Sequence, residues 1–149
     1  MAVTDIIKER IAENLIALLP FYHKKIFGPA GQGITGMQAA QYRTLGVLKR
    51  GDTPLSMSEL GKRQYISKPY MTILVNQLIQ DGYVQRIPDT IDRRVINIAI
   101  TTEGKKHLKQ VGSRYKETIK NMLSELDSRD LEELCQSLEK LRNILSKIS

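Results

Sequence analysis

Two groups of side chains in this sequence could do chemistry. The first lies on the polar side of the predicted helix from Ser67 to Gln80, a segment that contains no acidic residue. Asparagine and glutamine can bond to adenine edges, threonine and isoleucine can contact thymine methyl groups, and lysine can reach a phosphate. The candidate DNA-binding residues of this segment are Ser67, Lys68, Tyr70, Thr72, Ile73, Asn76 and Gln77. The alternative is an ordinary solvated helix face, but acidic residues are common on such faces.

The second group is the run Asp92-Arg93-Arg94, which follows a turn sequence. An arginine at the end of a stiff β-ribbon suits the narrow, strongly negative minor groove of DNA. Phosphate would repel Asp92, so its useful role is to orient an arginine through a charge-assisted hydrogen bond. The alternative is a surface turn with a local ion pair, which contributes little to stability.

The elements that must position these groups can be predicted from capping signals and periodicity. Ser67 and Pro69 begin a helix whose apolar residues share one face, and Gly82 ends it. Two helices are expected before it, over residues 35–49 and 56–63, each opened by a capping box. Strands are expected at 83–87 and 94–100 because apolar and polar residues alternate there. This order describes a winged helix-turn-helix.

Long amphipathic helices are expected on both sides of this unit, over residues 4–26, 101–126 and 128–148, with a glycine-rich loop at 28–33. The last helix carries leucines at heptad spacing. These apolar stripes exceed what a small wing domain can cover, so we expect a two-fold homodimer. The predicted fold is mainly α with a β-hairpin wing. Its parts are dimerisation segments at 1–33 and 105–149 and a DNA-binding domain at 34–104.

Composition excludes several other classes of protein. The chain has 149 residues and a net charge of +7, and residues 43–110 hold 12 basic against 6 acidic residues. A polyanion is therefore the expected partner of the middle of the chain. We expect a cytoplasmic protein without metal or cofactor, because the single Cys135 forms no internal disulfide and no catalytic constellation is visible. The glycines of residues 31–36 fit a dinucleotide fingerprint, but they follow a predicted helix instead of a strand.

Residues 34–104 resemble the MarR family of winged-helix transcription regulators. The resemblance rests on the motifs Met57-Ser58-Glu59-Leu60, Asp81-Gly82-Tyr83-Val84, Asp92-Arg93-Arg94 and Ile100-Thr101-Thr102-Glu103-Gly104. It implies a homodimer, joined through the terminal helices, that binds pseudo-palindromic DNA as a repressor. The helix beginning at Ser67 would enter the major groove, and a wing arginine would enter the minor groove.

The resemblance also implies control by small anionic aromatic ligands, such as salicylate-like phenols and carboxylates. A carboxylate needs a cation and an apolar wall. Arg86 is the first candidate for the cation and Lys8 the second, while Tyr42 could line the wall; each could equally have a surface or packing role. The alternative function is a winged helix that binds protein or RNA and has no operator. Cys135, beside the heptad leucines, is expected to be a buried structural thiol rather than a redox switch.

Overall fold

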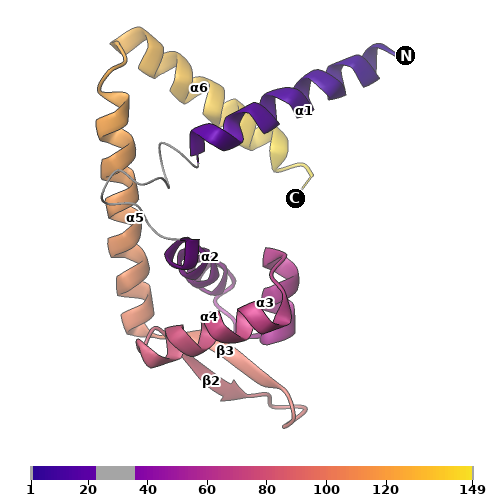
Figure 1. Cartoon of the computed structure of the whole chain (residues 1–149), viewed down its shortest axis with the longest axis vertical. Coiled ribbons are helices and arrows are strands. Elements are labelled where there is room, and N and C mark those ends of the chain that lie inside the picture. The colour runs from indigo at the N-terminus through magenta and orange to yellow at the C-terminus, as the bar shows by residue number, and fades with distance from the viewer. Residues whose placement is uncertain (1, 23–35, 149) are drawn as a thin grey trace. The chain divides into compact units, whose positions relative to one another are not determined.

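The computed structural model describes residues 2–22 and 36–148 of the chain. Two compact units, Met1–Arg114 and Tyr115–Ser149, are distinguished by their internal contacts. Figure 1 follows the elements along the chain. They are α1 (Val3–Phe21), α2 (Gly36–Gly51), β1 (Leu55–Ser56), α3 (Met57–Gln64), α4 (Lys68–Gln80), β2 (Val84–Pro88), β3 (Ile96–Ile100), α5 (Thr102–Leu123) and α6 (Ser128–Leu145). The predicted fold class, mainly helical with a hairpin wing, is confirmed.

The first unit is built around a three-stranded antiparallel sheet with the strand order β1-β3-β2. Ile98 at the centre of β3 lies opposite Arg86 on β2 and Leu55 on β1. The sequence does not predict β1, because a two-residue strand has no periodicity to recognise. The hairpin of β2 and β3 extends beyond α4 as the wing (Figure 1).

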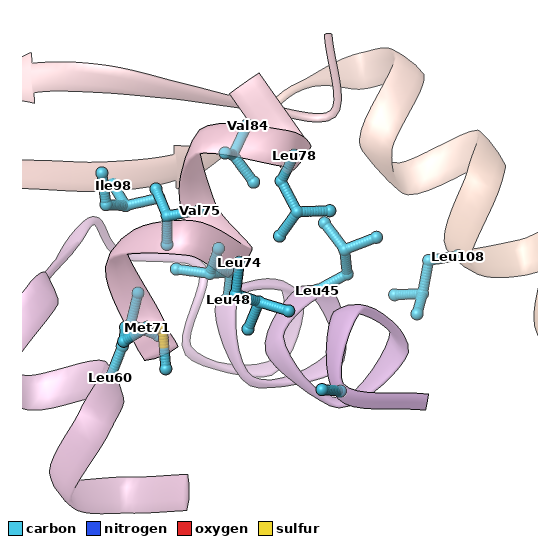
Figure 2. Packing of buried hydrophobic residues seen from close by; sticks show 11 residues of the cluster. Leu45, Leu48, Leu60, Met71, Leu74, Val75, Leu78, Val84, Ile98 and Leu108 are labelled. Carbon is cyan, nitrogen blue, oxygen red and sulfur yellow. The ribbon is translucent and has the colours of Figure 1, made fainter. Parts of the chain in front are cut away.

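Helices α2, α3 and α4 pack with this sheet around one apolar core. Figure 2 shows the buried side chains of this core, which α2, α3, α4, β2 and β3 contribute. They include Leu45, Leu48, Leu60, Met71, Leu74, Val75, Leu78, Val84 and Ile98, each at most 2% exposed. Burial of this kind contributes about 1.5–3 kcal/mol for each large apolar side chain. The core therefore fixes α4 firmly with respect to the wing.

Local capping bonds fix the helix starts that the sequence predicted. Ser56 accepts a hydrogen bond from the backbone N–H of Glu59 at 3.1 Å, and Ser67 accepts one from Tyr70 at 3.4 Å. Such a bond satisfies an amide that the helix itself leaves without a partner. At the start of α5, Thr101 accepts from the backbone N–H of Gly104 at 3.0 Å. The predicted capping box at residue 35 and the loop at 28–33 lie outside the described residues.

Helix α6 contrasts with this core, although its start was predicted equally well. Asp127 caps it by accepting from the backbone N–H of Asp130 at 2.8 Å. No residue of α6 is buried in the single chain; of its heptad leucines, Leu131, Leu134, Leu138 and Leu145 are exposed and Leu141 is half-buried. Cys135 is exposed as well, so the expectation of a buried thiol is wrong for the single chain. The reason is that the stripe of heptad leucines beside Cys135, called the α6 seam below, is not covered by other described residues of the single chain.

Helix α1 is likewise amphipathic by spacing and has no buried residue. Ile7, Ile11, Leu15 and Leu18 are each between 40% and 51% exposed. The predicted continuation of this helix to residue 26 lies outside the described part of the chain. Among residues 2–22 and 36–148, no helix combines the length and apolar character that a membrane span requires.

Candidate nucleic-acid interface

Helix α4 has one buried face and one polar, exposed face. Met71, Leu74, Val75 and Leu78 recur at three- and four-residue steps and are fully buried. The opposite face carries exposed side chains without a carboxylate, namely those of Pro69, Thr72, Ile73, Asn76 and Gln80. Because the buried face is held by the core, the exposed face is presented as a rigid surface.

The two edges of this face are tied to different neighbours. On the side of α2, the Gln41 side-chain amide donates to Gln77 Oε1 at 3.4 Å, and the Tyr70 hydroxyl lies 3.9 Å from Met37 Sδ. On the side of the wing, Arg86 Nη2 donates to Asn76 Oδ1 at 2.7 Å. Asn76 is thus held from β2, ten residues farther along the chain.

The first turn of α4 is suited to an anion. Ser67 is the N-cap, Lys68 is the first helical residue, and the first turn contains no acidic side chain. The aligned peptide dipoles place partial positive charge at this end of a helix. Thr72 Oγ1 donates to the carbonyl of Lys68 at 3.0 Å, so that hydroxyl can offer only its lone pairs to a ligand.

Asp89 organises the tip of the wing. Its carboxylate accepts hydrogen bonds from the backbone N–H groups of Ile91 and Asp92, at 3.2 and 3.0 Å, and from Asn97 Nδ2 at 2.9 Å. The bond from Asp92 is the main reason that the pKa of Asp89 lies below its ordinary value, followed by the bond from Asn97. The carboxylate is therefore charged at neutral pH and fixes the turn.

The predicted pairing of Asp92 with a wing arginine is observed with Arg94. The Arg94 backbone N–H and Nε donate to Asp92 Oδ1 at 3.0 and 3.1 Å, and Nη2 donates to Oδ2 at 3.3 Å. The Arg94 guanidinium is the main cause of the lowered pKa of Asp92. The Arg94 side chain is still 91% exposed, so it is oriented without being buried. Arg93 is also exposed at this tip.

The three candidate ligand residues have separate surroundings among the described contacts. Arg86 is bound to Asn76, and Lys8 lies 3.7 Å from Asp5 in an exposed ion pair within α1. Tyr42 is half-buried, and its hydroxyl lies 3.3 Å from the position that a Cβ at Gly112 would take.

Two exposed residues beside this surface are not predicted from the sequence. Tyr65, in the turn between α3 and α4, has a φ of 54° and is 97% exposed. Ile91, at the tip of the wing, is 94% exposed. Tyr65 could have been noticed because it occupies a helix end, where a left-handed conformation and a glycine are common.

Comparisons with known proteins find similarity to transcription regulators. Residues 33–95 match the model of the MarR family. The transcriptional repressor YetL of Bacillus subtilis is 40% identical over 76 residues, which are 50% of this chain and 46% of YetL. This chain thus spans less than half of the length of that relative. The repressor MdtR of the same organism is 29% identical over 64% of this chain and 61% of its own.

Solved structures extend the similarity over the chain. The YusO protein of Bacillus subtilis has a TM-score of 0.67 and 25% identity, covering 96% of this chain and 99% of its own. A mutant of MepR from S. aureus, solved bound to an oligodeoxyribonucleotide, has a TM-score of 0.54 and 26% identity, covering 71% and 78%. The transcriptional regulator Tm0710 of Thermotoga maritima has a TM-score of 0.62 and 27% identity, covering 93% and 94%.

Proposed function

We propose that this chain, whose residues 33–95 match the MarR family model, is a sequence-specific DNA-binding transcription regulator of the MarR type, acting as a repressor. The observation that carries the proposal is the acid-free face of α4, held against the core beside a wing whose arginine is oriented by a carboxylate. The MepR mutant bound to an oligodeoxyribonucleotide supports DNA as the partner.

In the proposed complex, α4 enters the major groove. Its first turn, with Lys68, binds a phosphate, while Asn76, Ile73 and Thr72 lie at the base edges. Arg94 enters the adjacent minor groove, with Arg93 as a second cation of the wing. Asp92 and Asp89 keep the wing in the conformation required, so that little ordering is needed when DNA binds.

We further propose that the regulator is a homodimer on pseudo-palindromic DNA. The exposed apolar residues of α1 and α6 supply the surface, consistent with dimerisation segments at residues 1–33 and 105–149 around a DNA-binding domain at 34–104. Two-fold symmetry would place two recognition helices on half-sites about one helical turn, or 34 Å, apart. A cytoplasmic location follows from this proposed role.

An anionic aromatic effector is proposed as the control signal. A ligand bound to the proposed dimer would alter the spacing of the two recognition helices and so weaken operator binding. Arg86, Lys8 and Tyr42 are the candidate residues for it. Isothermal titration of the wild type and of Arg86→Ala with salicylate tests this choice: weaker binding to the variant is expected, and equal affinity would remove Arg86 from the site.

DNA binding at increasing salt concentration tests the proposed function itself. Arg94→Ala should weaken binding to all sequences and reduce the slope of log K against log salt by about 1. Asn76→Ala should instead lose about 1–3 kcal/mol of discrimination at one base pair. Lys120→Ala, which removes an equal charge from an exposed ion pair with Glu117 on α5, is the control. If the DNA affinities of Arg94→Ala and Asn76→Ala both equal that of this control, a protein- or RNA-binding module is favoured.

A further inference from the structure

The contact between Arg86 and Asn76 determines which end of the Asn76 carboxamide is available for hydrogen bonding to a base. A guanidinium has only donor groups, so the amide atom that faces it must be the acceptor Oδ1. The distance of 2.7 Å is that of a charge-assisted hydrogen bond. The other end of the carboxamide, Nδ2 with its two N–H donors, is therefore the end that the exposed face of α4 presents.

This orientation has a consequence for base recognition. Adenine and guanine share the acceptor N7, but position 6 is an amino donor in adenine and a carbonyl acceptor in guanine. An asparagine reads adenine through both ends of its amide, because Oδ1 accepts from the amino group while Nδ2 donates to N7. Oδ1 keeps a second lone pair, but a donor that used it would bring the amino group of adenine close to the Arg86 guanidinium, whose positive charge opposes that pairing.

We infer that Arg86 and Asn76 form a single donor-only reading unit, which selects guanine over adenine at the base pair that Asn76 contacts. The inference rests on the proposed function and adds to it the chemistry of one base contact. Asn76 Nδ2 donates to N7 or O6, and the positive charge of Arg86 repels the amino group of adenine. Arg86 acts here as a positioning residue, because its effect on the base passes through Asn76.

The surroundings of the pair favour this arrangement. Arg86 lies on the same face of β2 as the buried Val84, and its neighbour across the sheet, Ile98, is also buried. Its backbone is therefore fixed by the core while its side chain extends to α4. In the free protein the bond is exposed to water. DNA would exclude that water and so strengthen the charge-assisted bond.

The experiment begins with a duplex that the wild type selects from random sequences. Asn76→Ala identifies the base pair at which discrimination depends on Asn76, and all four base pairs are then tested there. The wild type is expected to bind guanine about 10-fold more tightly than adenine. In Arg86→Met, which has an uncharged side chain of similar length, this ratio should fall below about 2-fold, because no positive charge then opposes the adenine amino group at Oδ1.

Three controls separate this effect from a general loss of charge. Lys106→Met removes a charge from an exposed pair on α5 and should weaken all four duplexes equally. Arg86→Lys keeps a cationic donor and should restore part of the guanine preference. In an Asn76→Ala background, Arg86→Met should change all four affinities by the same factor. A native-like thermal transition of each variant shows that it is folded.

The outcomes distinguish the inference from the proposed function. If the wild type selects no sequence, the proposed function fails. If it selects a site but prefers adenine at the Asn76 position, the inference is overturned. The inference is also overturned if Arg86→Met weakens all four duplexes equally and leaves the guanine-to-adenine ratio unchanged.

Discussion

The winged-helix core and helix α6 bury their leucines to very different extents. Leu74 on α4 is 0% exposed, whereas Leu138 on α6 is 44% exposed, although both belong to regular apolar stripes. The same helical periodicity thus leads to a completed core in one region and to an uncovered seam in the other. The core holds the exposed face of α4 on its own, whereas in the proposed homodimer a second protomer would cover the α6 seam.

The largest effect is expected from shortening one leucine in each of the two regions. Leu74→Ala should lower the free energy of unfolding by about 3–4 kcal/mol, because it removes buried contacts and leaves a cavity. Leu138→Ala is the matched change on α6, and its effect should depend on protein concentration, because it weakens association. Chemical denaturation at two protein concentrations measures both. Equal, concentration-independent losses would show that the two regions do not differ in this way.

The second prediction concerns the junction between the sheet and α5. A Cβ at Gly104 would collide with the backbone carbonyl of Tyr83, which also accepts from the Thr101 N–H at 3.0 Å. Gly104→Ala should therefore cost about 2–3 kcal/mol of stability. Gly46→Ala on α2, where a Cβ meets nothing within 4 Å, should instead stabilise the protein by about 0.5–1 kcal/mol. Thermal unfolding that shows the same sign for both would contradict the packing described here.

The third prediction concerns pH and the wing. Because the folded-state pKa of Asp89 is lower than its ordinary value of 3.8, the stability from its ionised form is present above that value. This stability is lost as the pH falls through the lowered folded-state pKa. The backbone amides of Ile91 and Asp92 should therefore be better protected from hydrogen exchange at pH 5 than at strongly acidic pH, once each rate is compared with the intrinsic exchange rate at that pH.

Asp89→Asn provides the comparison for this pH effect. The variant should show weaker protection of the same two amides at neutral pH and lack the acid-dependent change, because its neutral amide accepts more weakly. The core amides of α4 should be unaffected by it. Protection at the wing tip that is identical in the two proteins would show that the carboxylate does not organise this turn.

The smallest predicted effect lies in the turn between α3 and α4. Tyr65 adopts a left-handed conformation while its side chain is almost completely exposed. Tyr65→Gly should therefore stabilise the protein by about 0.5–1 kcal/mol, since glycine adopts this conformation without a Cβ penalty. Urea denaturation measures the change. A clear loss of stability would mean that the tyrosine ring makes contacts that outweigh the strain.

The sequence predicted best what is decided by neighbouring residues. The caps at Ser56 and Ser67 and the pairing of Asp92 with Arg94 join groups two or three positions apart, so spacing alone identifies them. The bond between Arg86 and Asn76 was not predicted, because it depends on how β2 packs beside α4. The exposure of Cys135 was mispredicted because periodicity marks an apolar seam without saying what covers it.

Selection of bound fragments from random duplex DNA tests the central claim most directly, that the α4 face and the wing of two protomers read a duplex. The account predicts enriched fragments with a pseudo-palindrome whose half-sites lie about one helical turn, 10–10.5 base pairs, apart. This enrichment should disappear for Asn76→Ala combined with Arg94→Ala. Fragments without a common sequence, or enrichment that survives the double substitution, would contradict it.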